Sequence, residues 1–98
     1  MSDCEMNIIA TVRSIQMLLS IVDSFSEIGI DIEDNSDKNT VGHKLWGTMT
    51  NLDKMLCRQM GYTENQIENL TMDMDIFTCP DVSDQYILDE LTNLKTSA

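Results

Sequence analysis

Apolar residues in the first third of the chain recur at the spacing of an α-helix. Ser2 and Glu5 have the spacing of a capping box, in which each side chain accepts a hydrogen bond from the other residue's backbone amide, so the helix is predicted to begin at once. The apolar residues that follow at intervals of three and four form one stripe: Ile8, Val12, Ile15, Leu19 and Val22. Gly29 is a suitable end for this helix, since glycine adopts the left-handed conformation without steric cost.

A second apolar set lies beside this stripe in the distal half of the same helix. From Leu18 onward the helix is apolar over roughly half of its circumference, which is more than one neighbouring helix usually covers. If the protein self-associates, we predict that the oligomer interface contains Leu18, Ile21, Phe25 and Ile28.

Two more helices are predicted in the middle and at the end of the chain. The first runs over residues 41–60 and ends at Gly61, and its buried stripe is Val41, Leu45, Met49, Leu52, Leu56 and Met60. The second follows Pro80 and covers about residues 81–95, with a stripe of Val82, Tyr86, Leu88, Leu91 and Leu94.

The stretch NLTMDMDIF, residues 69–77, alternates apolar and polar side chains and is the ambiguous part of the pattern. A capping box of Thr63 and Gln66 precedes it, and the helical spacing of the apolar residues after that box predicts a helix through Phe77. The alternative is an irregular or extended end after Met72. The resulting architecture is an all-α single domain over residues 1–98, a small four-helix bundle-like or orthogonal arrangement.

The formal net charge of −11 is unevenly distributed along the chain. Residues 1–37 and residues 59–98 each contain eight acidic residues and one cation, whereas residues 38–58 contain four cations and one acidic residue. A surface this negative repels the phosphates of nucleic acids and anionic membranes, so direct binding to either is not expected. It attracts basic protein surfaces instead.

The acidic residues lead to a prediction of function. Carboxylates on successive helical turns lie about 5–6 Å apart, a spacing close to that of neighbouring phosphates, so an acidic helical protein can occupy a groove built for DNA or RNA. We therefore predict a non-enzymatic inhibitor that binds a basic, nucleic-acid-binding surface of a protein partner by polyanion mimicry. The predicted partner-binding residues are Asp31, Glu33, Asp34, Asp37, Glu64, Glu68, Asp73 and Asp75.

The alternative from a different functional class is a self-associating helical module with a regulatory or structural role. In that case the acidity would serve solubility alone, as exposed charges commonly do. Small acidic inhibitors of nucleic-acid enzymes are common on mobile genetic elements, but this is a similarity of composition, and no motif links the chain to a family.

Candidate chemical sites in the sequence lack the required spacing. The acidic loop that begins at Asp31 resembles a calcium loop, but Ser36 and Gly42 occupy the positions that need glycine and glutamate. His43 has neither a second histidine nor a closely spaced cysteine pair, as a zinc site would require. It is also the only histidine that could act as a base for Cys57 or Cys79. We predict no catalytic residue, no metal and no cofactor.

The remaining features concern location and packing. An odd number of widely spaced cysteines fits a reducing compartment, and the N-terminal apolar segment is interrupted by Arg13, Gln16 and Asp23, so a cytoplasmic protein without a membrane span is expected. Of the eight methionines, four fall off the predicted stripes: Met6, Met17, Met55 and Met72.

Overall fold

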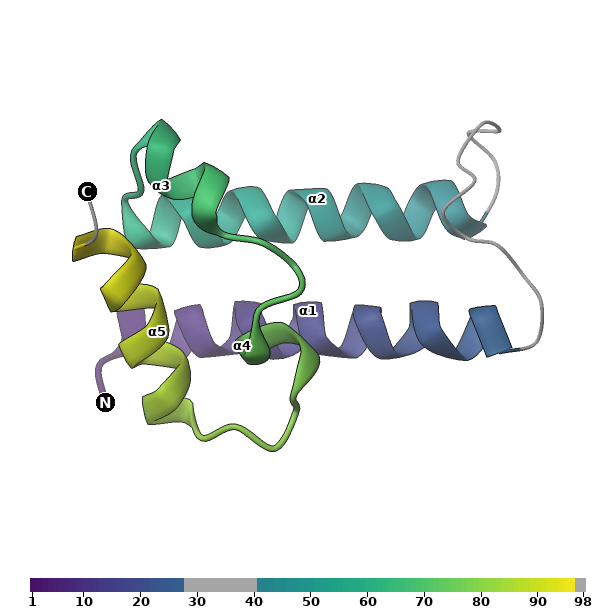
Figure 1. The fold of residues 1–98 in the computed structure, drawn as a ribbon, viewed down its shortest axis with the longest axis horizontal. Coiled ribbons are helices and arrows are strands. Elements are labelled where there is room, and N and C mark those ends of the chain that lie inside the picture. Colours follow the sequence, from purple (N-terminus) through teal and green to yellow (C-terminus); the bar gives the residue numbers. More distant parts are fainter. Residues whose placement is uncertain (28–40, 97–98) are drawn as a thin grey trace.

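Two long helices that run in opposite directions form the frame of the molecule (Figure 1). The computed structural model describes residues 1–27 and 41–96. Within these ranges it contains helices and no strand: α1 (Asp3–Glu27), α2 (Val41–Met60), α3 (Glu64–Asn69), α4 (Asp75–Thr78) and α5 (Asp84–Thr96). The all-α prediction is therefore confirmed.

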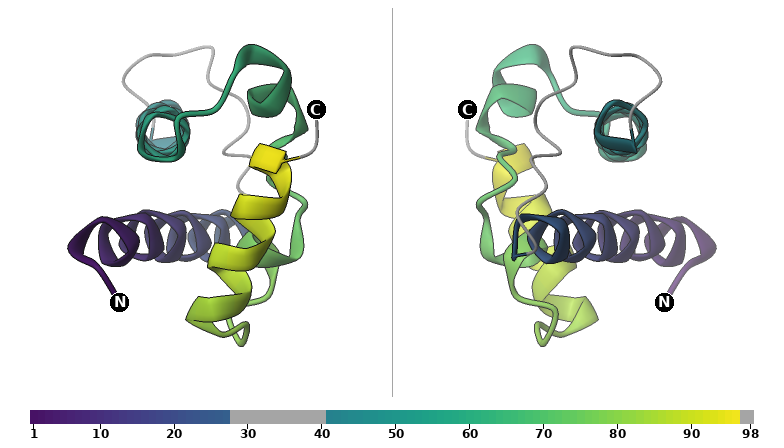
Figure 2. Two further views of the ribbon diagram at one scale, coloured as in Figure 1. Left: turned by 90° about the vertical axis from the view of Figure 1, so that its left-hand side faces the viewer. Right: turned by 90° about the vertical axis from the view of Figure 1, so that its right-hand side faces the viewer.

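The C-terminal third packs on one side of this frame. α5 runs across α1 and α2 near the N-terminus of α1, and α4 lies beside the middle of α1 (Figures 1 and 2). The view along α2 also shows that α1 and α2 cross at an angle (Figure 2). The packing is thus orthogonal in character, with five helices in the described residues where the sequence predicts four.

The start of α1 and the end of α2 lie where the sequence predicts them, whereas Gly29, the predicted end of the first helix, lies outside the described residues. The Ser2 amide donates to Glu5 Oε1 at 3.1 Å and the Glu5 amide donates to Ser2 Oγ at 3.2 Å, which completes the capping box. These hydrogen bonds from Ser2 hold the pKa of the Glu5 carboxyl below its usual value. At the end of α2, Gly61 has a φ of 68°, the left-handed conformation that lets the chain turn away from the helix.

The prediction of one helix through Phe77 is wrong. The capping box of Thr63 and Gln66 is present, but α3 ends at Asn69 and Leu70 is extended, with φ −86° and ψ 97°. Leu70, Ile76 and Phe77 are all buried in the same core, and a straight helix would carry the chain past α1. The break after Asn69 lets the chain turn back, so the irregular segment begins earlier than the alternative after Met72.

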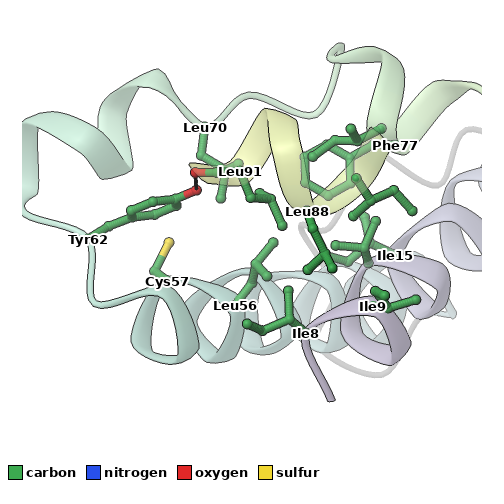
Figure 3. Close-up of a cluster of buried hydrophobic side chains, with 13 residues drawn as sticks. Ile8, Ile9, Ile15, Leu56, Cys57, Tyr62, Leu70, Phe77, Leu88 and Leu91 are labelled. Carbon is green, nitrogen blue, oxygen red and sulfur yellow. Dashed lines mark hydrogen bonds between the residues drawn. The ribbon is translucent and has the colours of Figure 1, made fainter. Parts of the chain in front are cut away.

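The core gathers residues from α1, α2, α5 and the segment around α4 (Figure 3). The predicted stripe of α1 is buried at Ile8, Val12 and Ile15, whereas Leu19 and Val22 are half-buried. The completely buried side chains outside α1 include Leu56, Ile76, Ile87 and Leu91. Figure 3 shows labelled side chains of α1, α2 and α5 meeting in this core.

The predicted register of the last helix is partly wrong. α5 begins at Asp84 rather than near Asp81, because Ser83 Oγ accepts a hydrogen bond from the Tyr86 amide at 3.1 Å. Ile87, which was not on the predicted stripe, is fully buried, whereas Tyr86 is 37% exposed. Burying Ile87 together with Leu91 turns Tyr86 toward solvent.

The segment Asp3–Phe25 of α1 is long and apolar enough, by length and composition alone, to cross a membrane. The core helix of a soluble protein and an N-terminal signal sequence both pass the same test. α1 supplies buried residues to the core, and its Arg13 and Gln16 side chains donate hydrogen bonds to residues of the C-terminal third. This is the arrangement of a core helix.

Candidate partner-binding surface

Four of the predicted partner-binding residues lie on the short α3–α4 segment, and all four are exposed. Glu64 and Glu68 are one turn apart on α3, and Asp75 is the first residue of α4. Asp73 lies between the two helices and accepts a hydrogen bond from the Thr71 hydroxyl. The other predicted acidic residues, Asp31, Glu33, Asp34 and Asp37, lie outside the described residues.

These carboxylates are not neutralised by neighbouring cations. Among residues 1–27 and 41–96, the one ion pair joins Arg13 to Asp84 at 2.9 Å. The cations of α2, namely Lys44, Lys54 and Arg58, are exposed and form no ion pair with any described carboxylate. The described cations of α2 therefore leave the acidic residues of α3 and α4 available to a partner.

A groove of about 740 Å³ lies between α1 and the segment 72–80. The half-buried Leu19 and Met72 and the 67% exposed Met17 supply its apolar surface, whereas Phe77 borders the groove but is only 1% exposed. The residues that line the groove are Arg13, Gln16, Met17, Leu19, Ser20, Asp23, Met72, Phe77, Thr78 and Pro80. The sequence pattern does not predict this groove, although two methionines off the predicted stripes, Met17 and Met72, are a signal of it.

Arg13 and Gln16 hold the two walls of the groove together. Arg13 Nη1 donates to Pro80 O at 3.0 Å, and Arg13 Nη2 donates to Val82 O at 2.8 Å and to Asp84 Oδ1 at 2.9 Å. In addition, Gln16 Nε2 donates to Ile76 O in a buried hydrogen bond of 2.7 Å, and its Oε1 accepts from Arg13 Nη1 at 3.2 Å. The shape of the groove thus depends on polar residues that the sequence marked only as interruptions of an apolar helix.

A smaller cavity of about 290 Å³ lies where α2 meets α3. Burial and the Asp53 carboxylate raise the pKa of the Cys57 thiol, which disfavours the nucleophilic thiolate. Burial and Cys57 raise the pKa of Tyr62 to about 12, and its hydroxyl donates to Leu91 O at 2.6 Å (Figure 3). Cys57 and Tyr62 are packing residues in this arrangement.

Asp53 lines the same cavity and carries a buried carboxylate oxygen, Oδ1, without a hydrogen-bond partner. Burial raises the pKa of this carboxyl above its ordinary value of 3.8, because the charged form loses solvation in the folded state. The charge of Asp53 therefore destabilises the folded state at neutral pH, and protonation relieves this destabilisation as the pH falls.

We expect Asp53→Asn to raise the free energy of unfolding at pH 7. The advantage over the native sequence should shrink as the pH falls through the raised pKa of Asp53 and disappear below 3.8, where the carboxyl is protonated in both states. Denaturant unfolding of both proteins at a series of pH values measures this difference. Asp81→Asn, at an exposed position, serves as the control because it changes the net charge by the same amount. A less stable Asp53→Asn variant at pH 7 would contradict the prediction.

The residues of the predicted oligomer interface lie in the C-terminal half of α1. Leu18, Ile21 and Phe25 are half-buried, and Ile28 lies outside the described residues. Two other apolar side chains of α1, those of Met6 and Met17, are more exposed, at 56% and 67%.

In the part of the chain that the structure describes, histidine, cysteine and acidic side chains form no group of three that could hold a metal ion. The thiols of Cys4 and Cys79 are exposed, that of Cys57 is buried, and none is in a disulfide.

Comparison of the chain with protein-family models, with curated protein sequences and with solved structures finds no match.

Proposed function

We propose that this protein is a non-enzymatic binding protein that attaches to a basic surface of another protein. In its most specific form, the proposal is that the protein inhibits a nucleic-acid-binding partner by occupying the surface that otherwise holds DNA or RNA. The observation that carries the proposal is that the carboxylates of α3 and α4 are exposed and form no ion pair with the described cations.

The carboxylate pair of α3 suits a partner with neighbouring cations. Glu64 and Glu68 lie on successive turns of α3, about 5–6 Å apart, whereas α4, which Asp75 begins, lies apart from α3 beside the middle of α1 (Figure 1). A partner that neutralises these carboxylates gains electrostatic attraction that speeds association and that weakens as salt screens the charges. Three free thiols are in keeping with the proposed reducing, cytoplasmic setting.

The competing function is self-association through α1. Leu18, Ile21 and Phe25 are half-buried in the monomer, so part of their apolar surface is already removed from water and less of it remains for pairing with a second copy. The carboxylates of α3, in contrast, are exposed.

The test uses a matched pair of charge variants and a partner captured from an extract of the native host. Glu64→Gln with Glu68→Gln should weaken binding about tenfold, since each removed ion pair contributes up to about 1 kcal/mol. Asp3→Asn with Glu27→Gln changes the net charge equally at positions outside the α3–α4 segment and should weaken binding less. Affinities measured by titration calorimetry at several salt concentrations provide the comparison.

Competition gives the second readout. Added duplex DNA or RNA should displace the protein from its partner, and raising the salt from about 0.1 M to about 1 M should release it, because the Debye length falls from about 10 Å to about 3 Å. A partner that stays bound at high salt and in the presence of excess nucleic acid would refute polyanion mimicry. Light scattering that shows a stable dimer, lost on replacing Ile21 and Phe25 by serine, would favour self-association instead.

A further inference from the structure

The groove between α1 and the segment 72–80 has the dimensions of a binding site. Its volume of about 740 Å³ lies within the range of roughly 300–1,000 Å³ that is common for ligand pockets. Methionine contributes from both walls, with Met17 on α1 and Met72 on the opposite segment. Methionine side chains are flexible and polarizable, and they are frequent on surfaces that adapt to apolar partners.

The charge around this apolar surface is negative. Asp23 lines the groove, and the exposed Asp73 and Asp81 directly follow two lining residues, Met72 and Pro80. None of these three carboxylates is in an ion pair within the described residues. The single cation in the lining, Arg13, already donates to four acceptors on Gln16, Pro80, Val82 and Asp84. An occupant therefore meets apolar side chains beside Asp23, with two more unpaired carboxylates next in the chain to lining residues.

We propose that this groove binds an apolar side chain of a basic protein segment, one that carries leucine, phenylalanine or methionine with lysine or arginine close by. This inference rests on the proposed function, because it identifies the basic partner's second means of attachment. The carboxylates attract the cations of that segment, and the apolar side chain is then removed from water against Leu19, Met17 and Met72. Burial of one large apolar side chain raises the affinity roughly 10- to 100-fold, and salt does not screen this contribution.

The probes for this proposal are three synthetic peptides of about 15 residues, long enough for partial helicity. The first places leucine at helical spacing among lysines. The second replaces every leucine with alanine and keeps the lysines, and the third keeps the leucines and replaces every lysine with glutamine. We expect the leucine–lysine peptide to bind at least about tenfold more tightly than either of the others. The alanine–lysine peptide loses the burial of a large apolar side chain, and the leucine–glutamine peptide loses its ion pairs with the carboxylates near the groove.

Two tryptophan variants test the location of the site. Ser20→Trp fills the groove from the α1 wall, where Ser20 is exposed and lines it. Ser14→Trp adds the same side chain at an exposed position of α1 outside the lining. Ser20→Trp should lower the affinity for the leucine–lysine peptide at least about tenfold, because the tryptophan blocks the peptide's apolar contact. Ser14→Trp leaves this contact open and should change the affinity less than about twofold. Thermal unfolding followed by circular dichroism checks that both variants are folded.

The native methionines give a readout that needs no variant. In ¹³C-methyl NMR spectra, addition of the leucine–lysine peptide should shift the methyl signals of Met17 and Met72 and leave those of Met6 and Met55, which are exposed outside the groove, in place.

The outcomes separate this inference from the proposed function. If the leucine–lysine and alanine–lysine peptides bind equally, and Ser20→Trp behaves as Ser14→Trp does, the groove proposal fails and the electrostatic function stands. If the leucine–glutamine peptide binds as tightly as the leucine–lysine peptide, the groove is an apolar site and attraction to a basic partner fails. If none of the three peptides binds, both proposals fail.

Discussion

Replacing Phe77 by alanine is expected to lower the free energy of unfolding by about 3–5 kcal/mol, the range found for buried phenylalanine. The Phe77 side chain is 1% exposed and is the largest of the fully buried side chains. It lies in the core that α1 and α5 share (Figure 3). Alanine would leave a cavity in this core. Ile76 would then be the one remaining buried side chain of α4. The loss is a large share of the roughly 5–15 kcal/mol that holds a small domain folded.

Denaturant unfolding followed by circular dichroism measures this loss, and Tyr86→Ala is the aromatic control. Tyr86 is 37% exposed, so its truncation creates no internal cavity and should cost much less. Because Phe77 also lines the groove, Phe77→Ala should weaken the leucine–lysine peptide even under conditions where the variant is folded. Equal losses for the two alanine variants would show that Phe77 is not part of the central packing.

The two long helices were predictable because several local signals agree. For α1, a capping box at the start and an apolar repeat at the helical period indicate the same element. For α2, the same repeat ends at a glycine, and Gly61 has the positive φ that only glycine adopts without strain. Neither signal depends on contacts with distant parts of the chain. Their agreement fixes the helix ends to within a residue or two.

The segment between α3 and α5 was less predictable because its conformation depends on tertiary contacts. The apolar spacing after Thr63 fits a continuous helix, yet Leu70, Ile76 and Phe77 reach the core only if the chain bends after Asn69. Which face of α5 is buried also depends on tertiary contacts. Ile87 and Tyr86 are neighbours in the sequence, and the position of α1 and α2 decides which of the two is buried.

The candidate site likewise has one part that was predictable from the sequence and one part that was not. Exposure of Glu64, Glu68, Asp73 and Asp75 follows from the cost of burying charge, so the sequence predicts it well. The groove does not follow from local sequence, because its walls lie about sixty residues apart in the chain and are joined by side chain to backbone hydrogen bonds of Arg13 and Gln16. Pairing a cation with distant backbone carbonyls leaves no periodic pattern that sequence analysis can detect.

Replacing Arg13 by methionine is expected to lower the free energy of unfolding by about 2 kcal/mol. A hydrogen bond from a charged donor contributes about 1.5–3 kcal/mol when buried, but the Arg13 side chain is 34% exposed, so water replaces part of what the variant loses. The acceptors that lose their donor include Pro80 O and Val82 O. Methionine keeps the length of the side chain and removes its charge and its donors, which isolates the polar contribution.

The consequence for the groove distinguishes Arg13 from an ordinary surface charge. Without the guanidinium, the segment 80–84 loses three of its bonds to α1, and its backbone amides should exchange with solvent faster in hydrogen-exchange measurements. In Arg13→Lys these amides should exchange at a rate between those of the native protein and Arg13→Met, because one ammonium group cannot satisfy all the acceptors that a planar guanidinium bridges. Asp84→Asn, which removes the exposed ion pair alone, should cost at most about 1 kcal/mol. If Arg13→Met proves no more costly than Asp84→Asn, the backbone hydrogen bonds of Arg13 do not hold the groove wall, and the stability of the groove must come from Gln16 and the apolar core.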